Sequence, residues 1–175
     1  GTCRCATRPP KPAHKRRAML HLALITASNR QPDWIDAGAD DYAKRLRGRC
    51  ALEIKTVPLA KRTASAPVER AIADEGERLL ALVPQGAHVV ALCEGGKPWS
   101  TKDLAQKLDS WMRLGVTVCF LVGGPDGLSQ ACVERARERW SLSNLTLPHG
   151  LVKVLVAEAL YRAWSVLENH PYHRA

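Results

Sequence analysis

The segment NHPYHR at residues 169–174 combines side chains that are unusual together at a chain end. A proline stiffens it, Tyr172 offers a stacking surface, His173 offers an imidazole, and Arg174 carries a fork of hydrogen-bond donors. These groups suit an RNA base and its phosphate, although the segment could also simply dock on the body of the protein. We take Tyr172, His173 and Arg174 as candidate catalytic residues.

Two glycine-rich loops follow apolar runs that have the composition of buried strands. Gly95-Gly96 follows the run 87–93, and GGPDG at residues 123–127 follows the run 116–122. Ligands of open α/β sheets bind outside the carboxyl ends of the strands, and glycine lets the backbone approach a ligand closely. Either loop alone could be only a tight turn, but two such loops at neighbouring strand ends favour a ligand pocket.

Several standard motifs are missing from the chain. It contains no GxxxxGK[ST], no GxGxxG after the first strand, no HExxH and no GxSxG, which argues against a P-loop, a standard dinucleotide site and two hydrolase classes. His170 and His173 are close in sequence but have no carboxylate nearby, so we expect no metal site. The six cysteines form no CxxC pair, and we expect buried, reduced thiols.

The elements that must position these loops alternate between strand and helix patterns. Apolar runs and period-two alternation predict strands over 20–27, 51–58, 87–93 and 116–122, and a short strand or extended loop over 141–147. Apolar residues at helical spacing predict helices over 32–47, 67–83, 101–114, 129–139 and 151–168. This alternation is typical of an α/β fold with a mainly parallel sheet flanked by helices. We expect a single domain over 19–175.

The net charge of +9 suggests a polyanionic partner, but most of it lies outside the predicted domain. Residues 1–18 hold six basic and no acidic residues, which leaves +3 for the remainder. We expect this segment to be disordered. It has the outline of a signal or transit peptide, but we favour an upstream extension with Met19 as the natural start. No apolar stretch approaches the ~20 residues of a membrane span, so we expect a cytoplasmic protein.

Five motifs in a fixed order resemble those of the ribosomal RNA large subunit methyltransferase H family, which belongs to the SPOUT class of knotted methyltransferases. They are GKPW at 96–99, LVGGPDGLS at 121–129, WSLSNLTLPH at 140–149, LVAEALYRAW at 155–164 and NHPYHR at 169–174. The resemblance runs from about Met19 to Arg174. The chain departs from the family's pattern at Gly150, which we expect to leave the turn before the last helix flexible.

The resemblance implies a trefoil knot in the C-terminal half, a homodimer and a pocket for S-adenosylmethionine formed by the knot loops. The implied substrate is a pseudouridine in large-subunit (23S) ribosomal RNA, methylated at N3 on the assembled ribosome. Apolar side chains and glycine backbone suit this cofactor better than a charged phosphate cradle would. The matched cofactor-binding residues are Leu92, Gly123, Leu142, Ser143, Asn144, Leu145, Thr146 and Leu147.

The implied reaction transfers a methyl group in line from a sulfonium to a ring nitrogen, and positioning of the reactants should dominate catalysis. We expect His173 to remove the N3 proton or contact the base, Arg174 to bind phosphate and Tyr172 to stack on the base. Glu158 and Arg162 lie four residues apart on the last predicted helix, and we expect them to form an ion pair.

Two other functions stay open at this point. A non-catalytic ribosome-binding module with the same fold would give no heat with S-adenosylmethionine in calorimetry. An oxidoreductase or hydrolase that depends on a nucleotide would bind NAD or ATP through the glycine-rich loops, although the missing motifs argue against it.

Overall fold

The computed structural model describes residues 19–174, so the expected disorder of 1–18 lies outside the described residues. Five strands form one sheet in the order β2-β1-β4-β3-β5, and every neighbouring pair is parallel. The strands are β1 (Leu20–Ala27), β2 (Cys50–Val57), β3 (His88–Pro98), β4 (Val118–Val122) and β5 (Glu138–Ser141). The predicted α/β fold with a parallel sheet is confirmed.

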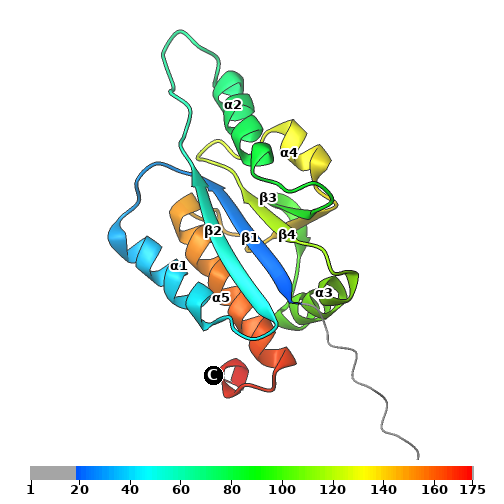
Figure 1. Cartoon of the computed structure of the whole chain (residues 1–175). Helices are drawn as coiled ribbons and strands as arrows, with labels where there is room; N and C mark the ends of the chain where they lie inside the picture. Colours follow the sequence, from blue (N-terminus) through cyan, green and yellow to red (C-terminus); the bar gives the residue numbers. More distant parts are fainter. Residues whose placement is uncertain (1–18, 175) are drawn as a thin grey trace, which may run out of the picture.

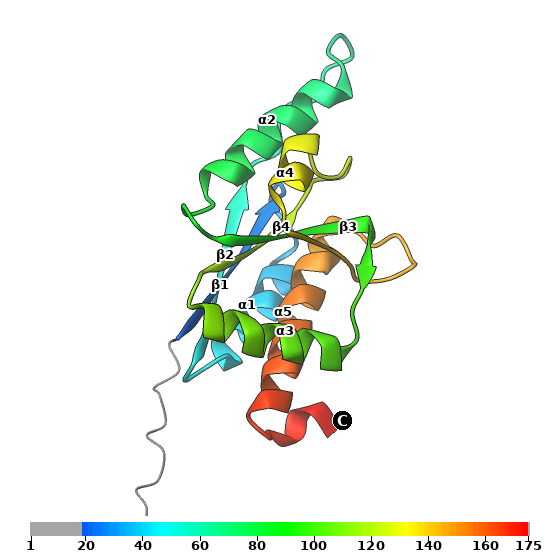
Figure 2. The same cartoon turned by 90° about the vertical axis from the view of Figure 1, so that its right-hand side faces the viewer.

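Helices cover both faces of this sheet, as Figures 1 and 2 show. The helices are α1 (Asp33–Arg45), α2 (Val68–Ala81), α3 (Thr101–Leu114), α4 (Gln130–Arg135) and α5 (His149–Leu167), followed by the 3₁₀ turn η1 (Pro171–Arg174). One face carries α1, α3 and α5, and the other carries α2 and α4. Within residues 19–174, no helix is long and apolar enough to cross a membrane.

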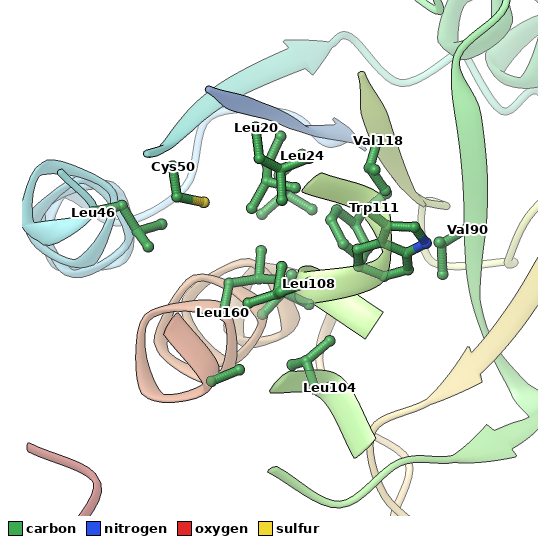
Figure 3. Packing of buried hydrophobic residues seen from close by; sticks show 14 of the residues in the cluster. Leu20, Leu24, Leu46, Cys50, Val90, Leu104, Leu108, Trp111, Val118 and Leu160 are labelled. Carbon is green, nitrogen blue, oxygen red and sulfur yellow. The ribbon is translucent and has the colours of Figure 1, made fainter. Parts of the chain in front are cut away.

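The two helical layers give the protein two hydrophobic cores. Alternate residues of β1 face opposite layers, so that Leu22 and Leu24 join the core under α3 and α5 while Ala23 and Ile25 join the core under α2. Burial on both faces explains why the central strands read as continuous apolar runs. Figure 3 shows the larger core, in which Trp111 of α3 lies among leucines and valines from several elements.

The segment after the fourth strand differs from the predicted long helix over 129–139. Helix α4 ends at Arg135, and the chain joins the sheet again from Glu138 as β5. Strand β3 is also longer than predicted, because a register shift between Leu92 and Lys97 lets both residues pair with Trp140. Most of the predicted strand or extended loop over 141–147 is therefore a loop that leaves the sheet after Ser141.

Gly150 lies inside the first turn of α5 and is buried, contrary to the expected flexible turn. A Cβ atom at this position would lie 2.9 Å from Ile35 Cδ1 and 2.4 Å from Gln31 Oε1. The small residue thus allows the start of α5 to pack closely on α1 and on the loop before it. Close packing, rather than flexibility, accounts for glycine here.

The cysteines of the described chain agree with the expectation of reduced thiols. Cys50, Cys119 and Cys132 are buried and free, and Cys93 is free and half-buried. Cys3 and Cys5 lie outside the described residues.

Candidate functional site

A cavity of about 440 Å³ opens beside the carboxyl ends of β4 and β5 and the part of β3 that pairs with the end of β4. Three segments line it: residues 92–94 within β3, the glycine-rich loop 123–127 after β4, and the loop after β5. The parallel sheet brings these segments together, because the carboxyl ends of parallel strands meet at one edge. The first turns of α5 close the cavity with His149 and Val152.

Seven of the eight predicted cofactor residues line this cavity, which places them together although they are spread over 56 positions of sequence. The seven are Leu92, Gly123, Leu142, Ser143, Leu145, Thr146 and Leu147. Asn144 is exposed and is not among the lining residues. Sequence reasoning missed Glu94, Asp126 and His149, which also line the cavity. The binding role of the predicted residues stays a prediction.

The glycine-rich loop folds back on itself at the cavity wall. Gly127 has a φ of 90°, and its N–H donates to the carbonyl oxygen of Gly124 at 3.0 Å. A Cβ atom on Gly123 would lie only 2.3 Å from the carbonyl carbon of Gly127, so this position has no room for a side chain. At Gly123 the loop therefore presents backbone rather than a side chain to a ligand.

The loop after β5 is held by short-range hydrogen bonds. Ser141 Oγ donates to the Ser143 carbonyl at 3.2 Å, and the Leu145 N–H donates to Ser143 Oγ at 2.9 Å. Thr146 Oγ1 donates to Glu94 Oε1 at 3.1 Å and so links this loop to β3. Leu145 lines the cavity and is 73% exposed, which leaves a large apolar surface at the mouth.

The charged groups of the cavity are acidic. Among its lining residues only Glu94 and Asp126 carry carboxylates, and Lys and Arg are absent from the lining. This arrangement favours a cationic ligand over a phosphate. Burial raises the pKa of the Cys93 thiol above its usual range, so this lining cysteine is a poor nucleophile.

The C-terminal tail is oriented by the way in which α5 ends. Asn169 adopts a φ of 54°, and the N–H groups of Asn169 and His170 donate to the carbonyls of Val166 and Ser165 at 3.4 and 2.9 Å. This is a Schellman motif, in which asparagine takes the left-handed position that glycine more often occupies. The motif turns the chain back, so that η1 packs against the end of α5.

Tyr172 anchors the tail to the body. Its hydroxyl donates to Glu158 Oε1 at 3.1 Å and lies 3.3 Å from the hydroxyl of Tyr42. Its ring lies 4.6 Å from the ring of Tyr161 and under the Arg162 guanidinium at 4.9 Å. Burial, with these hydrogen bonds, raises the pKa of Tyr172 far above its usual range, so the hydroxyl stays protonated as a donor. The tail therefore docks on the body of the protein, which was the alternative given for the segment 169–174.

The predicted ion pair of the last helix is confirmed, since Arg162 Nε lies 2.8 Å from Glu158 Oε1. Of the two other tail residues, His173 has a buried Nδ1 without a hydrogen-bond partner among the described residues, and Arg174 is exposed. The roles of Tyr172, His173 and Arg174 in catalysis stay predictions.

The first turns of α5 line the cavity, whereas the tail packs at the other end of this helix, as Figures 1 and 2 show. The helix has 19 residues, which corresponds to a length of about 28 Å at the helical rise per residue. None of the three predicted catalytic residues lines the cavity. A single chain therefore does not bring the two predicted halves of the site together. Within residues 19–174, no group of three or more His, Cys, Asp or Glu side chains is arranged to hold a metal ion.

Comparison with known proteins identifies the family to which this architecture belongs. The family model described as predicted SPOUT methyltransferase matches residues 20–173. The chain belongs to the SPOUT methyltransferase family. It is 52% identical over 155 residues to the ribosomal RNA large subunit methyltransferase H of Methylococcus capsulatus, a match that covers 89% of this chain and 100% of the relative. The family resemblance seen in the five motifs is confirmed.

A solved structure supports the SPOUT fold at much lower identity. The probable methylase family protein of Haemophilus influenzae superposes with a TM-score of 0.52 at 12% identity, over 87% of this chain and 70% of that one. This similarity is one of fold alone.

Replacing Tyr172 tests the anchoring of the tail in this SPOUT methyltransferase. Tyr172→Phe keeps the ring contacts but removes the hydrogen bond to Glu158, so the free energy of unfolding in urea should fall by about 1 kcal/mol. Tyr172→Ala removes both and should cost more. Amide exchange in residues 170–174 should accelerate in the same order. Wild-type stability and exchange in both variants would show that the tail is not anchored by Tyr172.

Proposed function

We propose that this protein uses S-adenosylmethionine to methylate N3 of a pseudouridine in large-subunit (23S) ribosomal RNA, on the assembled ribosome in the cytoplasm. The observation that carries the proposal is the cavity, whose lining contains seven of the eight residues that the family motifs assign to the cofactor. The identity of 52% to a relative named for ribosomal RNA methylation supports the choice of substrate.

The lining fits this cofactor in three respects. Leu92, Leu142 and Leu147 offer an apolar wall for adenine. The crowded backbone at Gly123 and Gly124 offers hydrogen-bonding groups where no side chain would fit. The carboxylates of Glu94 and Asp126 suit the positive charges of the sulfonium and the amino group. When bound, the cofactor supplies an electrophilic methyl group.

The tail residues supply what the cavity lining lacks, an arginine that can bind phosphate, and add a second imidazole to that of His149. A new bond forms between the methyl carbon and N3 as the carbon–sulfur bond breaks, and the N3 proton must leave. The half-buried imidazole of His173 takes this proton, directly or through water. Arg174 is exposed and binds a phosphate of the RNA. Tyr172 holds His173 and Arg174 in place, and the accessible part of its half-buried ring stacks on the base.

We infer a homodimer, and the separation of these parts supports it. The tail lies about one helix length from the cavity of its own chain, so a second copy must present its tail there. Two large apolar side chains on the adjacent helices α1 and α5, Trp34 and Leu155, are 61% and 36% exposed. We infer that the second copy covers this face. The trefoil knot in the C-terminal half is part of the same proposal and rests on family membership.

A glycine substitution tests the cavity as the cofactor site. Gly123→Ala forces the backbone of the loop apart, because its Cβ would lie 2.3 Å from Gly127, and should weaken S-adenosylmethionine binding in calorimetry at least about tenfold. Gly95→Ala is the matched control, since a Cβ there has no atom within 4 Å. Mass spectrometry of ribosomal RNA nucleosides should then detect 3-methylpseudouridine with wild type and Gly95→Ala only. Equal binding by both variants would contradict the assignment of the cavity.

Removal of the tail tests the second half of the site. A chain ending at Asn169 keeps every residue of the cavity lining, so its affinity for S-adenosylmethionine should match that of wild type. Its methyl transfer to ribosomes should fall at least about 100-fold, the usual minimum for a lost acid–base group. Full-length His173→Ala should reproduce much of this loss. Normal transfer by the truncated chain would show that the tail has no part in the reaction.

A further inference from the structure

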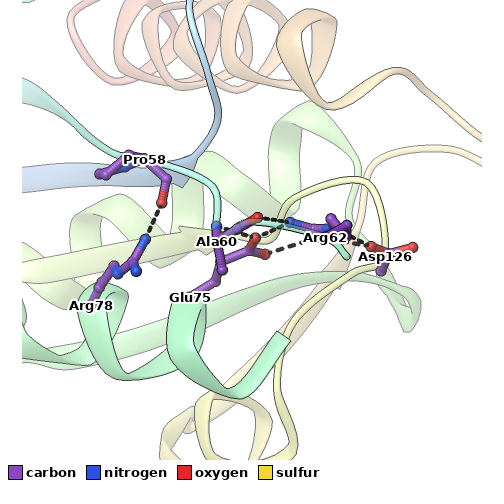
Figure 4. A network of polar contacts seen from close by, with 6 residues as sticks. All are labelled: Pro58, Ala60, Arg62, Glu75, Arg78 and Asp126. Atoms are coloured by element: carbon purple, nitrogen blue, oxygen red, sulfur yellow. Dashed lines mark hydrogen bonds and ion pairs between the residues drawn. The ribbon is translucent and has the colours of Figure 1, made fainter. Parts of the chain in front are cut away.

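Arg62, in the loop between β2 and α2, connects two carboxylates on different elements (Figure 4). Its Nη2 lies 2.7 Å and its Nε 3.1 Å from Asp126 Oδ2. Its Nη1 binds Glu75 Oε1 and also donates to the Ala60 carbonyl at 3.0 Å. All three guanidinium nitrogens are therefore engaged, and the side chain spans from α2 to the glycine-rich loop of the cavity.

Glu75 is the buried end of this network. It lies on α2 and is only 2% exposed, and a buried carboxylate requires a compensating charge and hydrogen bonds. Arg62 supplies the charge, and the Ala60 N–H donates to Glu75 Oε1 at 2.9 Å. Hydrogen bonds to Glu75 and then Asp126 raise the pKa of Arg62 above its ordinary value, so the guanidinium keeps its charge. A second arginine near this network, Arg78 of α2, donates to the Pro58 carbonyl at 2.9 Å.

The other end of the network is the cavity wall. Asp126 belongs to the cavity lining, whereas Arg62 and Glu75 do not. The backbone of the glycine-rich loop also lies close to Glu75, since a Cβ on Gly124 would be 2.7 Å from Leu59 Cδ2 and 3.0 Å from Glu75 Oε2. The position of the loop therefore depends on the contacts that hold it against Glu75, and Arg62 makes such a contact through Asp126.

We propose that Arg62 is a positioning residue of the cofactor pocket, which holds Asp126 and the loop 123–127 against the buried carboxylate of Glu75. The inference rests on the proposed function, because the ligand of the pocket is S-adenosylmethionine. Arg62 acts through Asp126 and does not itself touch the cofactor. Arginine suits this role because its planar fork can bind two carboxylates at once, whereas the ammonium of a lysine is a single point charge.

Arg62→Lys separates positioning from simple charge compensation. The lysine keeps a positive charge beside Glu75 but loses the two-sided fork, so the variant should remain folded at 25 °C. The dissociation constant for S-adenosylmethionine and the KM for it should each rise about tenfold, as expected for one lost charged hydrogen bond. The kcat at saturating cofactor should change less than about twofold, because binding alone is weakened.

Asp126→Asn and the double variant test the route of the effect. If Arg62 acts through Asp126, the double variant should bind the cofactor no more than about twofold more weakly than the weaker single variant. The control is Arg113→Lys, which alters an exposed pair with Asp109 on α3 and should bind as wild type does. Melting curves establish that each variant is folded at the temperature of the titration.

Three results would overturn the inference. Wild-type affinity in Arg62→Lys would show that the arginine does not position the loop, while leaving the proposed function intact. Losses that multiply to about a hundredfold in the double variant would show that the two residues act independently. Absence of S-adenosylmethionine binding by the wild-type protein would overturn both this inference and the proposed function.

Discussion

The five strands run in one direction, and the candidate site depends on that constraint. Parallel strands end at the same edge of a sheet, so residues 92–94, the loop 123–127 and the loop after β5 meet around one cavity. Each contributes something different: a strand segment with Leu92 and Glu94, a crowded glycine backbone and a leucine-rich loop. The Arg62 network then fixes the glycine loop from the other side, through Asp126. Sheet topology thus sets where the cavity lies, and the side chains of its lining set the chemistry proposed for it.

The rigidity of α5 sets the second constraint. Its first turns close the cavity with His149 and Val152, and its last turn carries the Schellman motif that directs the tail. The cavity and the tail therefore lie at opposite ends of one helix and cannot approach each other within one chain. Tyr172, bound to Glu158, adds to the separation by holding the tail at its own end. The proposed reaction, in which the tail takes part, therefore includes a second copy of the chain.

The sequence predicts local features well and non-local ones poorly. The run 20–27 and the glycine loop could be recognised because alternation, apolar content and glycine act on neighbouring residues. The end of α4 at Arg135 could not, because it depends on β5 pairing with distant Val90 and Lys97. Arg62 and Asp126 are 64 residues apart, so no pattern signals their contact. Gly150 was misjudged for the same reason, since its constraint comes from the contact with Ile35.

The central claim is that one copy's cavity works with the other copy's tail, and mixed dimers test it most directly. One protomer carries Gly123→Ala with an intact tail, and the other ends at Asn169 with an intact cavity. Each alone should be inactive on ribosomes. After subunit exchange at equal amounts, half of the dimers are mixed and each has one complete site, so methylation should recover to about one quarter of the wild-type rate. No recovery, in mixed dimers shown to form, would contradict the account, because cavity and tail would then have to act within the same chain.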